Sequence, residues 1–198
     1  MKWAFIPERI DYDGSHLASH FAYKRASLVG DSIVAFVGAC NVRAECMVDV
    51  ADLADGCKII SREMLHFIVE HFDTDLGKAI LWQRLLVSLL QQAVNTRLWA
   101  SKSDRFVERD GDDLFVGDSK LTVSVATASP VSCLIHLGVN IDATGAPVDA
   151  IGLADLLPRE DLEALRTDVM VRYVAEHESV SEARSLVRGV TEFDGKAN

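Results

Sequence analysis

The sequence predicts an α+β protein in which a mainly antiparallel, mixed sheet packs against helices. The first observation is the order of local patterns, because groups of strand-like runs alternate with helical ones along the chain. The second is that the strand-like runs of the second half are joined by short turns, which favours antiparallel pairing. The third is composition: 198 residues, 49% of them hydrophobic, suffice to bury one sizeable core.

The first 50 residues are predicted to be rich in strands. Short apolar runs occupy residues 3–6, 33–37 and 46–50. Between the first two runs, a turn signal at residues 13–15 precedes residues 16–23, which we expect to form one or two turns of helix.

Two helices are predicted next. Ser61 is a suitable N-cap for a helix over residues 61–72, whose apolar positions follow helical spacing. Thr74 would cap a second helix over residues 76–99, which is apolar on nearly every side and is therefore expected to be the central buried helix. Its two tryptophans are expected in the core: Trp82 and Trp99.

The second half of the chain is predicted to contain four strands and a helical end. The strands are expected at residues 105–109, 114–116, 120–126 and 132–141. Pro158 opens a final helix whose charged residues form a solvated face.

The end of the chain is expected to continue this helical part. A short helix is predicted near residues 181–187, and residues 195–198 are predicted to form a frayed tail. Since no linker is apparent, we expect one domain, with residues 1–155 as its α+β part and residues 156–198 as a helical extension.

Composition excludes several classes of function. Thirty acidic and 20 basic residues give a net charge of −10, so neither nucleic acid nor an anionic membrane is an expected partner. No stretch offers the roughly 20 apolar residues of a membrane helix, and the first residues lack the apolar run of a signal peptide, so we expect a cytoplasmic protein. The four cysteines show no CxxC spacing, which argues against a zinc site.

The strongest chemical signal lies in residues 112–121. Lys120 begins a predicted strand just after a tight turn, and its ammonium group would suit a carboxylate or phosphate oxygen. Asp112 and Asp113 precede it by eight and seven residues, so a hairpin would bring a carboxylate and the lysine into one region.

This segment resembles the central motif of biotin and lipoate protein ligases. Their pattern is Asn-Asp, a short apolar strand, a turn, Lys and small residues, followed by a Gly-x-Asn at the end of a later strand. Asp113, Lys120, Gly138 and Asn140 match at the right spacings, and Asp112 stands where that family has Asn.

The whole chain more closely resembles an uncharacterised prokaryotic family of conserved proteins with that ligase-like fold. The shared stretches are residues 12–15, 30–36, 47–49 and 64–70, and the likeness runs over most of residues 1–155. It implies a biotin/lipoate ligase (class II synthetase)-like fold.

The resemblance also implies a chemistry. In the ligases the lysine contacts the acyl carboxylate and the nucleotide phosphate, which together form an acyl-adenylate; Lys120 would have that role, with ATP and Mg²⁺ as the implied cofactors. A cation there would neutralise charge that builds on the transferring phosphoryl group. The chain departs from the ligases in lacking their Arg- and Gly-rich adenylate loop, where it has only Lys24 and Arg25, and in having Val123 where they usually have glycine.

Other polar residues are candidates that also have a structural interpretation. Asp13, Ser15 and His20 belong to a polar cluster that could carry nucleophile chemistry or could cap a helix. Arg25 is the best carboxylate or phosphate clamp of the N-terminal half, and a surface ion pair is as plausible. For Asp112, Asp113 and Asn140, the alternatives to ligand binding are turn formation and hydrogen bonding to backbone.

The histidines do not suggest a metal site. His66 and His71 are five apart on a predicted helix and so would not share one face. His136 lies in an apolar strand and is expected to be an interior group with its hydrogen bonds satisfied.

Two kinds of function therefore remain. The first is a ligase or acyltransferase that binds or activates a small carboxylic acid or acyl ligand, with Lys120 as the catalytic anchor. The second is a non-catalytic ligand-binding or interaction protein on the same fold, which the lack of the adenylate loop favours. A homodimer is a further expectation, because exposed strand edges in this fold often pair.

Overall fold

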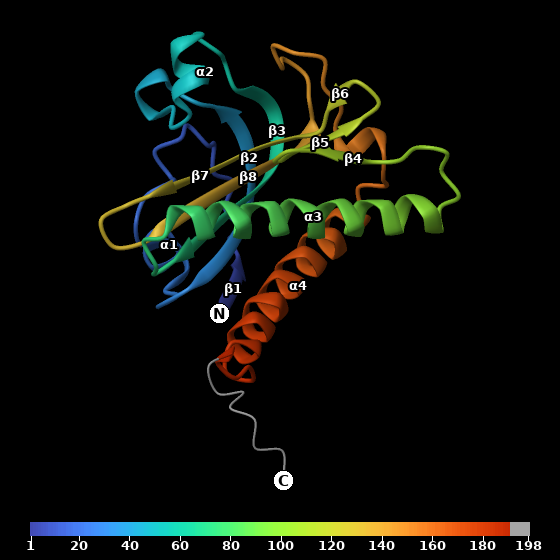
Figure 1. Cartoon of the computed structure of the whole chain (residues 1–198). Coiled ribbons are helices and arrows are strands. Elements are labelled where there is room, and N and C mark those ends of the chain that lie inside the picture. Colours follow the sequence, from blue (N-terminus) through green and yellow to red (C-terminus); the bar gives the residue numbers. More distant parts are fainter. Residues whose placement is uncertain (191–198) are drawn as a thin grey trace.

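A five-stranded sheet forms the centre of the computed structural model, which describes residues 1–190 (Figure 1). The strand order is β1-β2-β3-β8-β7, with β1 parallel to β2 and all other neighbours antiparallel. The strands are β1 (Lys2–Phe5), β2 (Ser32–Asn41), β3 (Ile60–His71), β7 (Thr122–Ala128) and β8 (Cys133–Asp142).

Two long helices cover one face of this sheet. Helix α3 (Leu76–Ala100) crosses the sheet and α4 (Asp161–Ala183) packs beside it, as Figure 1 shows. Leu86, Leu90 and Tyr173 are fully buried in the core between the helices and the sheet. Burial of such side chains contributes about 2 kcal/mol each to the free energy of folding, so this layer supplies most of the apolar stabilisation.

The opposite face is covered by short elements and loops. Helix α1 (Phe21–Ala26), the 3₁₀ helix η1 (Ala44–Cys46) and helix α2 (Val50–Ala54) belong to it. Tyr12 and Phe36 are members of a second apolar cluster beneath these segments. This thinner cover leaves space between the loops and the sheet.

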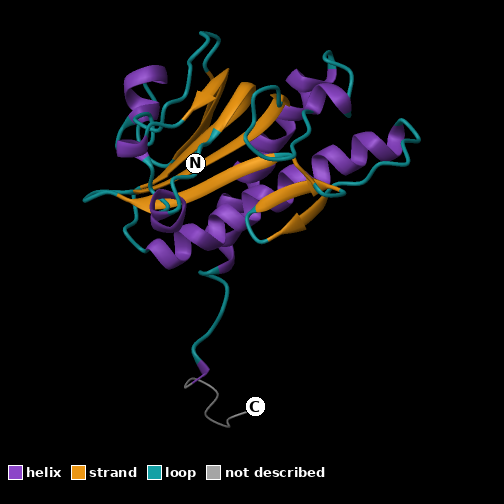
Figure 2. Ribbon diagram, turned by 90° about the horizontal axis from the view of Figure 1, so that it is seen from above, coloured by secondary structure: helices purple, strands orange, loops and turns teal. Residues whose placement is uncertain are grey.

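A small three-stranded sheet extends from one edge of the molecule (Figure 2). Its strands are β4 (Glu108–Asp110), β5 (Asp113–Val116) and β6 (Ser119–Lys120), all antiparallel. Leu121 N–H donates to the Leu114 carbonyl, and Leu114 N–H donates to the Thr122 hydroxyl, at 2.8 Å in both cases. These bonds attach the small sheet to β7, and a 3₁₀ helix, η2 (Leu153–Asp155), precedes α4.

The structure confirms the α+β class and corrects two predicted elements. Residues 61–72 do not form a helix but strand β3, which is buried on both faces; a strand of this kind has no polar alternation, so its apolar positions also fit helical spacing. Residues 46–50 do not form a strand, because Asp49 accepts hydrogen bonds from Ala51 N–H and Asp52 N–H and so caps α2.

Smaller differences concern single residues and ends. Trp99 is exposed, not in the core, because it lies in the last turn of α3 beyond the sheet, whereas Trp82 is buried as expected. The N-cap of α3 is Asp75 in place of Thr74, and α4 continues as one helix to Ala183. The predicted tail at residues 195–198 lies outside the described residues. None of the helices within residues 1–190 has the length and apolarity needed to cross a membrane.

Candidate functional site

The backbone of Lys120 is fixed on both sides. Its N–H donates to the Asp149 carbonyl at 2.9 Å, and its own carbonyl accepts from Ile151 N–H at 3.0 Å. The side-chain amide of Asn140 donates to the same carbonyl at 3.3 Å. Because three hydrogen bonds from two neighbouring segments, residues 149–151 and β8, hold this residue, the lysine stem leaves the sheet from a well-defined point.

Asp113 and Lys120 form an ion pair, with 2.6 Å between Oδ2 and Nζ. They are diagonal neighbours across the β5–β6 hairpin, in which Phe115 lies opposite Lys120, so the contact follows from the hairpin that the sequence predicts. Burial raises the pKa of Asp113, and the Lys120 ammonium opposes this only in part. The second carboxylate oxygen, Oδ1, is buried and accepts no hydrogen bond from any described residue.

Lys120 lines a groove between the sheet and the loops of its open face. The groove has a volume of about 160 Å³ and lies between the α2–β3 connection and residues 146–150. Its apolar walls include Met64, Val123 and Val148. Its polar groups come from Asn140 and Ser61, together with Thr122, Asp52 and Lys58. A cavity with apolar walls and a few polar groups is typical of a site for a small amphiphilic ligand.

A second, smaller cavity of about 50 Å³ adjoins the groove. The two share Asp52, Ile59 and Val123, and the smaller one reaches Tyr12 and His136. The Tyr12 ring stacks on His136 with 3.9 Å between ring centroids. Val123 is thus one of three residues between the two spaces, at the position where the ligases that the motif resembles usually have glycine.

Asp112 and Asp113 point to opposite sides of the chain. Asp112 accepts hydrogen bonds from Gln83 at 2.9 Å and from Arg84 at 3.0 Å, both on α3. Ser124 also donates to it at 3.3 Å. This carboxylate joins the small sheet to the helix layer and does not face the groove.

Gly138 lies on β8 between His66 on β3 and Val123 on β7. A Cβ atom there would come within 3.0 Å of Met64 Cε and 3.2 Å of His136 Cε1. Glycine at this position therefore leaves room for the Met64 side chain that forms part of the groove wall.

The N-terminal candidates do not join Lys120. Asp13 accepts hydrogen bonds from the backbone and hydroxyl of Ser15 and pairs with Arg43 at 3.0 Å, which makes a closed turn. Arg25 is exposed at the end of α1. Within the described part of the chain, neither Asp13 nor Arg25 lines the groove.

His20 marks the opposite end of the sheet. Its backbone N–H donates to the buried carboxylate of Glu70 at 2.8 Å and 2.9 Å, and its ring lies against Phe72. Glu70 is six residues along β3 from Met64, or about 20 Å at 3.3 Å per residue. His20 is therefore a structural neighbour of α1 and not part of the groove.

Sequence reasoning missed several groove residues. Asp52 and Lys58 come from α2 and the α2–β3 connection, where no element was predicted between residues 50 and 61. Met64 was assigned to a helix, so its place opposite Asn140 was not foreseen. The sequence signal that could have placed Met64 on a strand is the mostly apolar run of residues 64–69, because such a run also fits a strand that is buried on both faces.

Comparison with known proteins identifies a family. Residues 1–188 match the family described as a domain of unknown function, DUF366. An uncharacterised protein of Methanocaldococcus jannaschii is 34% identical over 186 residues, which is 91% of this chain and 81% of that protein. The chain belongs to the DUF366 family.

Solved structures place this DUF366 protein in a broader fold group. A protein of unknown function from Pyrococcus horikoshii superimposes with a TM-score of 0.82 at 39% identity, over 95% of this chain and 99% of that one. A biotin protein ligase from Aquifex aeolicus in complex with biotin superimposes with a TM-score of 0.53 at 10% identity, over 89% of this chain and 71% of that one. The DUF366 protein therefore has the biotin/lipoate ligase-like fold that the motif predicted.

Proposed function

We propose that the groove binds a small carboxylic acid and that Lys120 Nζ contacts its carboxylate. The observation that carries this proposal is the combination of a fixed lysine backbone, a lysine side chain that lines the groove, and apolar side chains in the walls of the same groove. A carboxylate would meet the ammonium group, and the acyl chain would lie against Met64 and Val123.

The Asp113–Lys120 pair suits an exchange of partners. A ligand carboxylate competes with Asp113 for the ammonium group, and Asp113 can release that group by taking up a proton, because burial raises its pKa. Once the ligand carboxylate pairs with Lys120, the buried Asp113 accepts a proton from solvent more readily than an exposed aspartate does. Charge in the groove then stays balanced: one carboxylate replaces another beside Lys120.

The reaction that we propose for the bound acid is activation by ATP. The acid's carboxylate oxygen attacks the α-phosphorus, the bond to pyrophosphate breaks, and an acyl-adenylate results. Two lysines, Lys58 and Lys120, line the groove. Two carboxylates lie close to them, because Asp52 also lines the groove and Asp149 is hydrogen-bonded to Lys120 through its backbone. Since these carboxylates repel a triphosphate, we propose that ATP enters with Mg²⁺.

A second function is ligand binding without catalysis. Arg25 is exposed and lies away from Lys120, so the described N-terminal segment supplies the groove with no guanidinium group for a nucleotide. In this alternative the protein binds the acid and ATP has no effect on it.

Binding and exchange measurements separate these functions. Calorimetric titration with octanoate, lipoate and biotin tests the acid, and ATP–pyrophosphate exchange in the presence of each acid and Mg²⁺ tests activation. We expect saturable binding of at least one acid, acid-dependent exchange, and loss of both in Lys120→Met. Lys102→Met, at an exposed position after α3, is the control and should behave as wild type.

The outcomes are distinct. Binding without exchange in wild type supports the non-catalytic alternative. Unchanged acid binding in Lys120→Met would refute the role of this lysine, and lack of binding by every acid would refute the proposal.

A further inference from the structure

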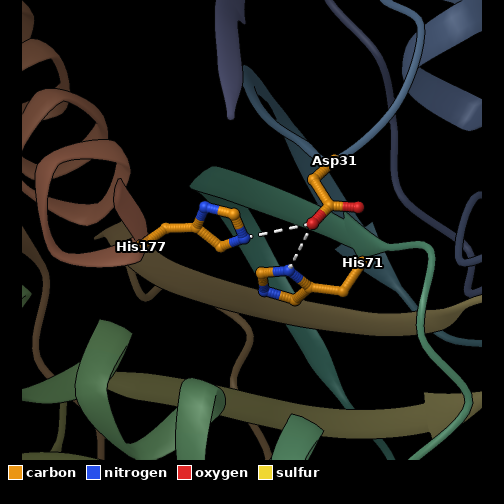
Figure 3. Close-up of side chains that lie close together, drawn as sticks. All are labelled: Asp31, His71 and His177. Atoms are coloured by element: carbon orange, nitrogen blue, oxygen red, sulfur yellow. Dashed lines mark hydrogen bonds and ion pairs between the residues drawn. The ribbon is translucent and has the colours of Figure 1, made fainter. Parts of the chain in front are cut away.

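Three side chains from three separate elements converge on the helix-covered face of the sheet (Figure 3). Asp31 immediately precedes β2, His71 ends β3, and His177 lies on α4. Asp31 Oδ2 is 3.1 Å from His177 Nε2 and 3.6 Å from His71 Nδ1. One ligand atom from each residue lies within 4.8 Å of the other two.

We propose that Asp31, His71 and His177 bind a divalent first-row transition metal ion of the Zn²⁺ type. This site is independent of the acid-binding groove, because the groove lies on the opposite face of the sheet and shares no residue with it. Two ligand atoms at about 2.0–2.1 Å from a tetrahedral zinc ion lie about 3.3 Å apart. The separations of 3.1 Å and 3.6 Å in this cluster bracket that value.

The groups around the cluster orient two of the three ligands. His71 Nε2 is 2.8 Å from the Tyr173 hydroxyl. When Nε2 carries the imidazole proton and donates it to the hydroxyl oxygen, the lone pair of Nδ1 faces Asp31. Asp31 Oδ1 accepts a hydrogen bond from Phe72 N–H at 2.8 Å, which leaves Oδ2 directed at the histidines. Trp82 stacks on the His71 ring with 5.4 Å between centroids. Such outer partners are the usual support of metal-binding histidines and carboxylates.

The ligand set and its surroundings indicate the class of metal. Two imidazole nitrogens and one carboxylate suit zinc and its first-row neighbours, whereas Mg²⁺ and Ca²⁺ prefer oxygen ligands. The cluster borders a cavity of about 230 Å³ whose other charged lining residues are Lys78, Arg184, Asp73 and Asp75. Three protein ligands beside a cavity leave a fourth position for water or a small anion.

The site was not predictable from sequence spacing. The ligands are separated by 40 and 106 residues, and His71 was assigned to a helix. On strand β3, His71 belongs to the layer that contacts α4, which brings it beside His177.

Metal binding by untagged protein tests the proposal. Isothermal titration with Zn²⁺ and visible absorption with Co²⁺ should show one site per chain, with the d–d bands of a tetrahedral ion. Asp31→Asn and His177→Gln should each weaken Zn²⁺ binding by more than about tenfold, and Tyr173→Phe by about tenfold. His20→Gln, an exposed histidine outside the cluster, is the control and should match wild type.

Each outcome decides the proposal. Far-ultraviolet circular dichroism establishes that the variants are folded, and His177 is suitable for substitution because its side chain is 21% exposed. Unaltered Co²⁺ spectra in both Asp31→Asn and His177→Gln, or no Zn²⁺ binding by wild type at micromolar concentrations, would overturn the proposal. In that case the three residues form a hydrogen-bonded link between α4 and the sheet without a metal.

Discussion

His66 and His136 lie side by side on neighbouring strands, with 3.0 Å between Nδ1 of His66 and Nε2 of His136. His66 Nε2 also contacts the Gly38 carbonyl at 3.4 Å, and Tyr12 stacks over both rings. Burial lowers the pKa of His66 to about 3 and that of His136 well below its usual value. Both imidazoles are therefore neutral near pH 7, and one donates its proton to the other.

This pair predicts a loss of stability in acid. Below the ordinary histidine pKa of about 6.5 the unfolded chain binds protons that the buried rings cannot, so stability falls between about pH 6.5 and pH 3. At pH 5, a histidine whose pKa is about 3 when folded contributes a loss of about 2 kcal/mol. Urea unfolding at pH 7 and pH 5 measures the effect, and His66→Gln should show a smaller loss than wild type. An equal loss in wild type and His66→Gln, with the exposed His20→Gln as control, would contradict it.

Strand β3 shows how far sequence patterns determined the fold. The alternation of strand and helix groups, helix α3 and strand β8 were predictable, because each has an apolar pattern of suitable length between clear turns or caps. Residues 60–71 were not, because the two neighbouring strands and both covering layers bury every position from Met64 to His71, polar ones included. Tertiary context, which no local pattern contains, decides between strand and helix there.

The candidate site shows the same division. The Asp113–Lys120 contact was predictable since it depends only on one hairpin. The groove was not, because Lys58 and Met64 reach it through long-range packing. Asp13 and Arg25 were candidates because of their residue types, and the structure places them in a closed turn and at the end of a short helix, away from the groove.

Asp113 predicts a pH dependence of acid binding. Because burial raises its pKa, Asp113 takes up a proton at a higher pH than an exposed aspartate, and this frees Lys120 for the ligand. Affinity for octanoate should therefore increase as the pH falls towards the range in which Asp113 takes up a proton, until the acid itself is protonated. Calorimetric titration across this range measures it. Asp113→Asn should bind with little pH dependence above pH 6, and a wild-type pH profile in this variant would contradict the argument.

At Gly38, the addition of a single methyl group is expected to cause a large loss of stability. An added Cβ would lie 1.8 Å from the Ile10 carbonyl oxygen, and the segment that contains Ile10 is bonded to β2 through Val37 and Ala39. Because the backbone must move to accommodate this atom, Gly38→Ala should lower the free energy of unfolding by about 3 kcal/mol or more. Urea unfolding measures the loss. Stability within about 0.5 kcal/mol of wild type would show that the two segments can separate freely.

Gly138→Ala should have a milder effect on stability and a larger one on binding. Its Cβ would meet Met64 Cε, the end of a flexible side chain, which can move into the groove. We expect a loss of about 1 kcal/mol in stability, since a displaced methionine repacks easily. Octanoate should bind more weakly than to wild type, and unchanged affinity in calorimetry would mean that Met64 does not form the wall that the ligand contacts.

Val123 predicts the length of the acyl chain. It lies between the groove of about 160 Å³ and the cavity of about 50 Å³, and it lines both. Val123→Ala should join the two spaces and admit a longer chain, with each newly buried methylene worth about 0.8 kcal/mol, or about fourfold in Kd. Titration with the straight-chain acids from butanoate to decanoate measures the preference. If Val123→Ala prefers longer acids than wild type does and Lys120→Met binds none of them, the carboxylate lies at the lysine and the acyl chain lies beneath Val123. Identical chain-length preferences in wild type and Val123→Ala would exclude that orientation.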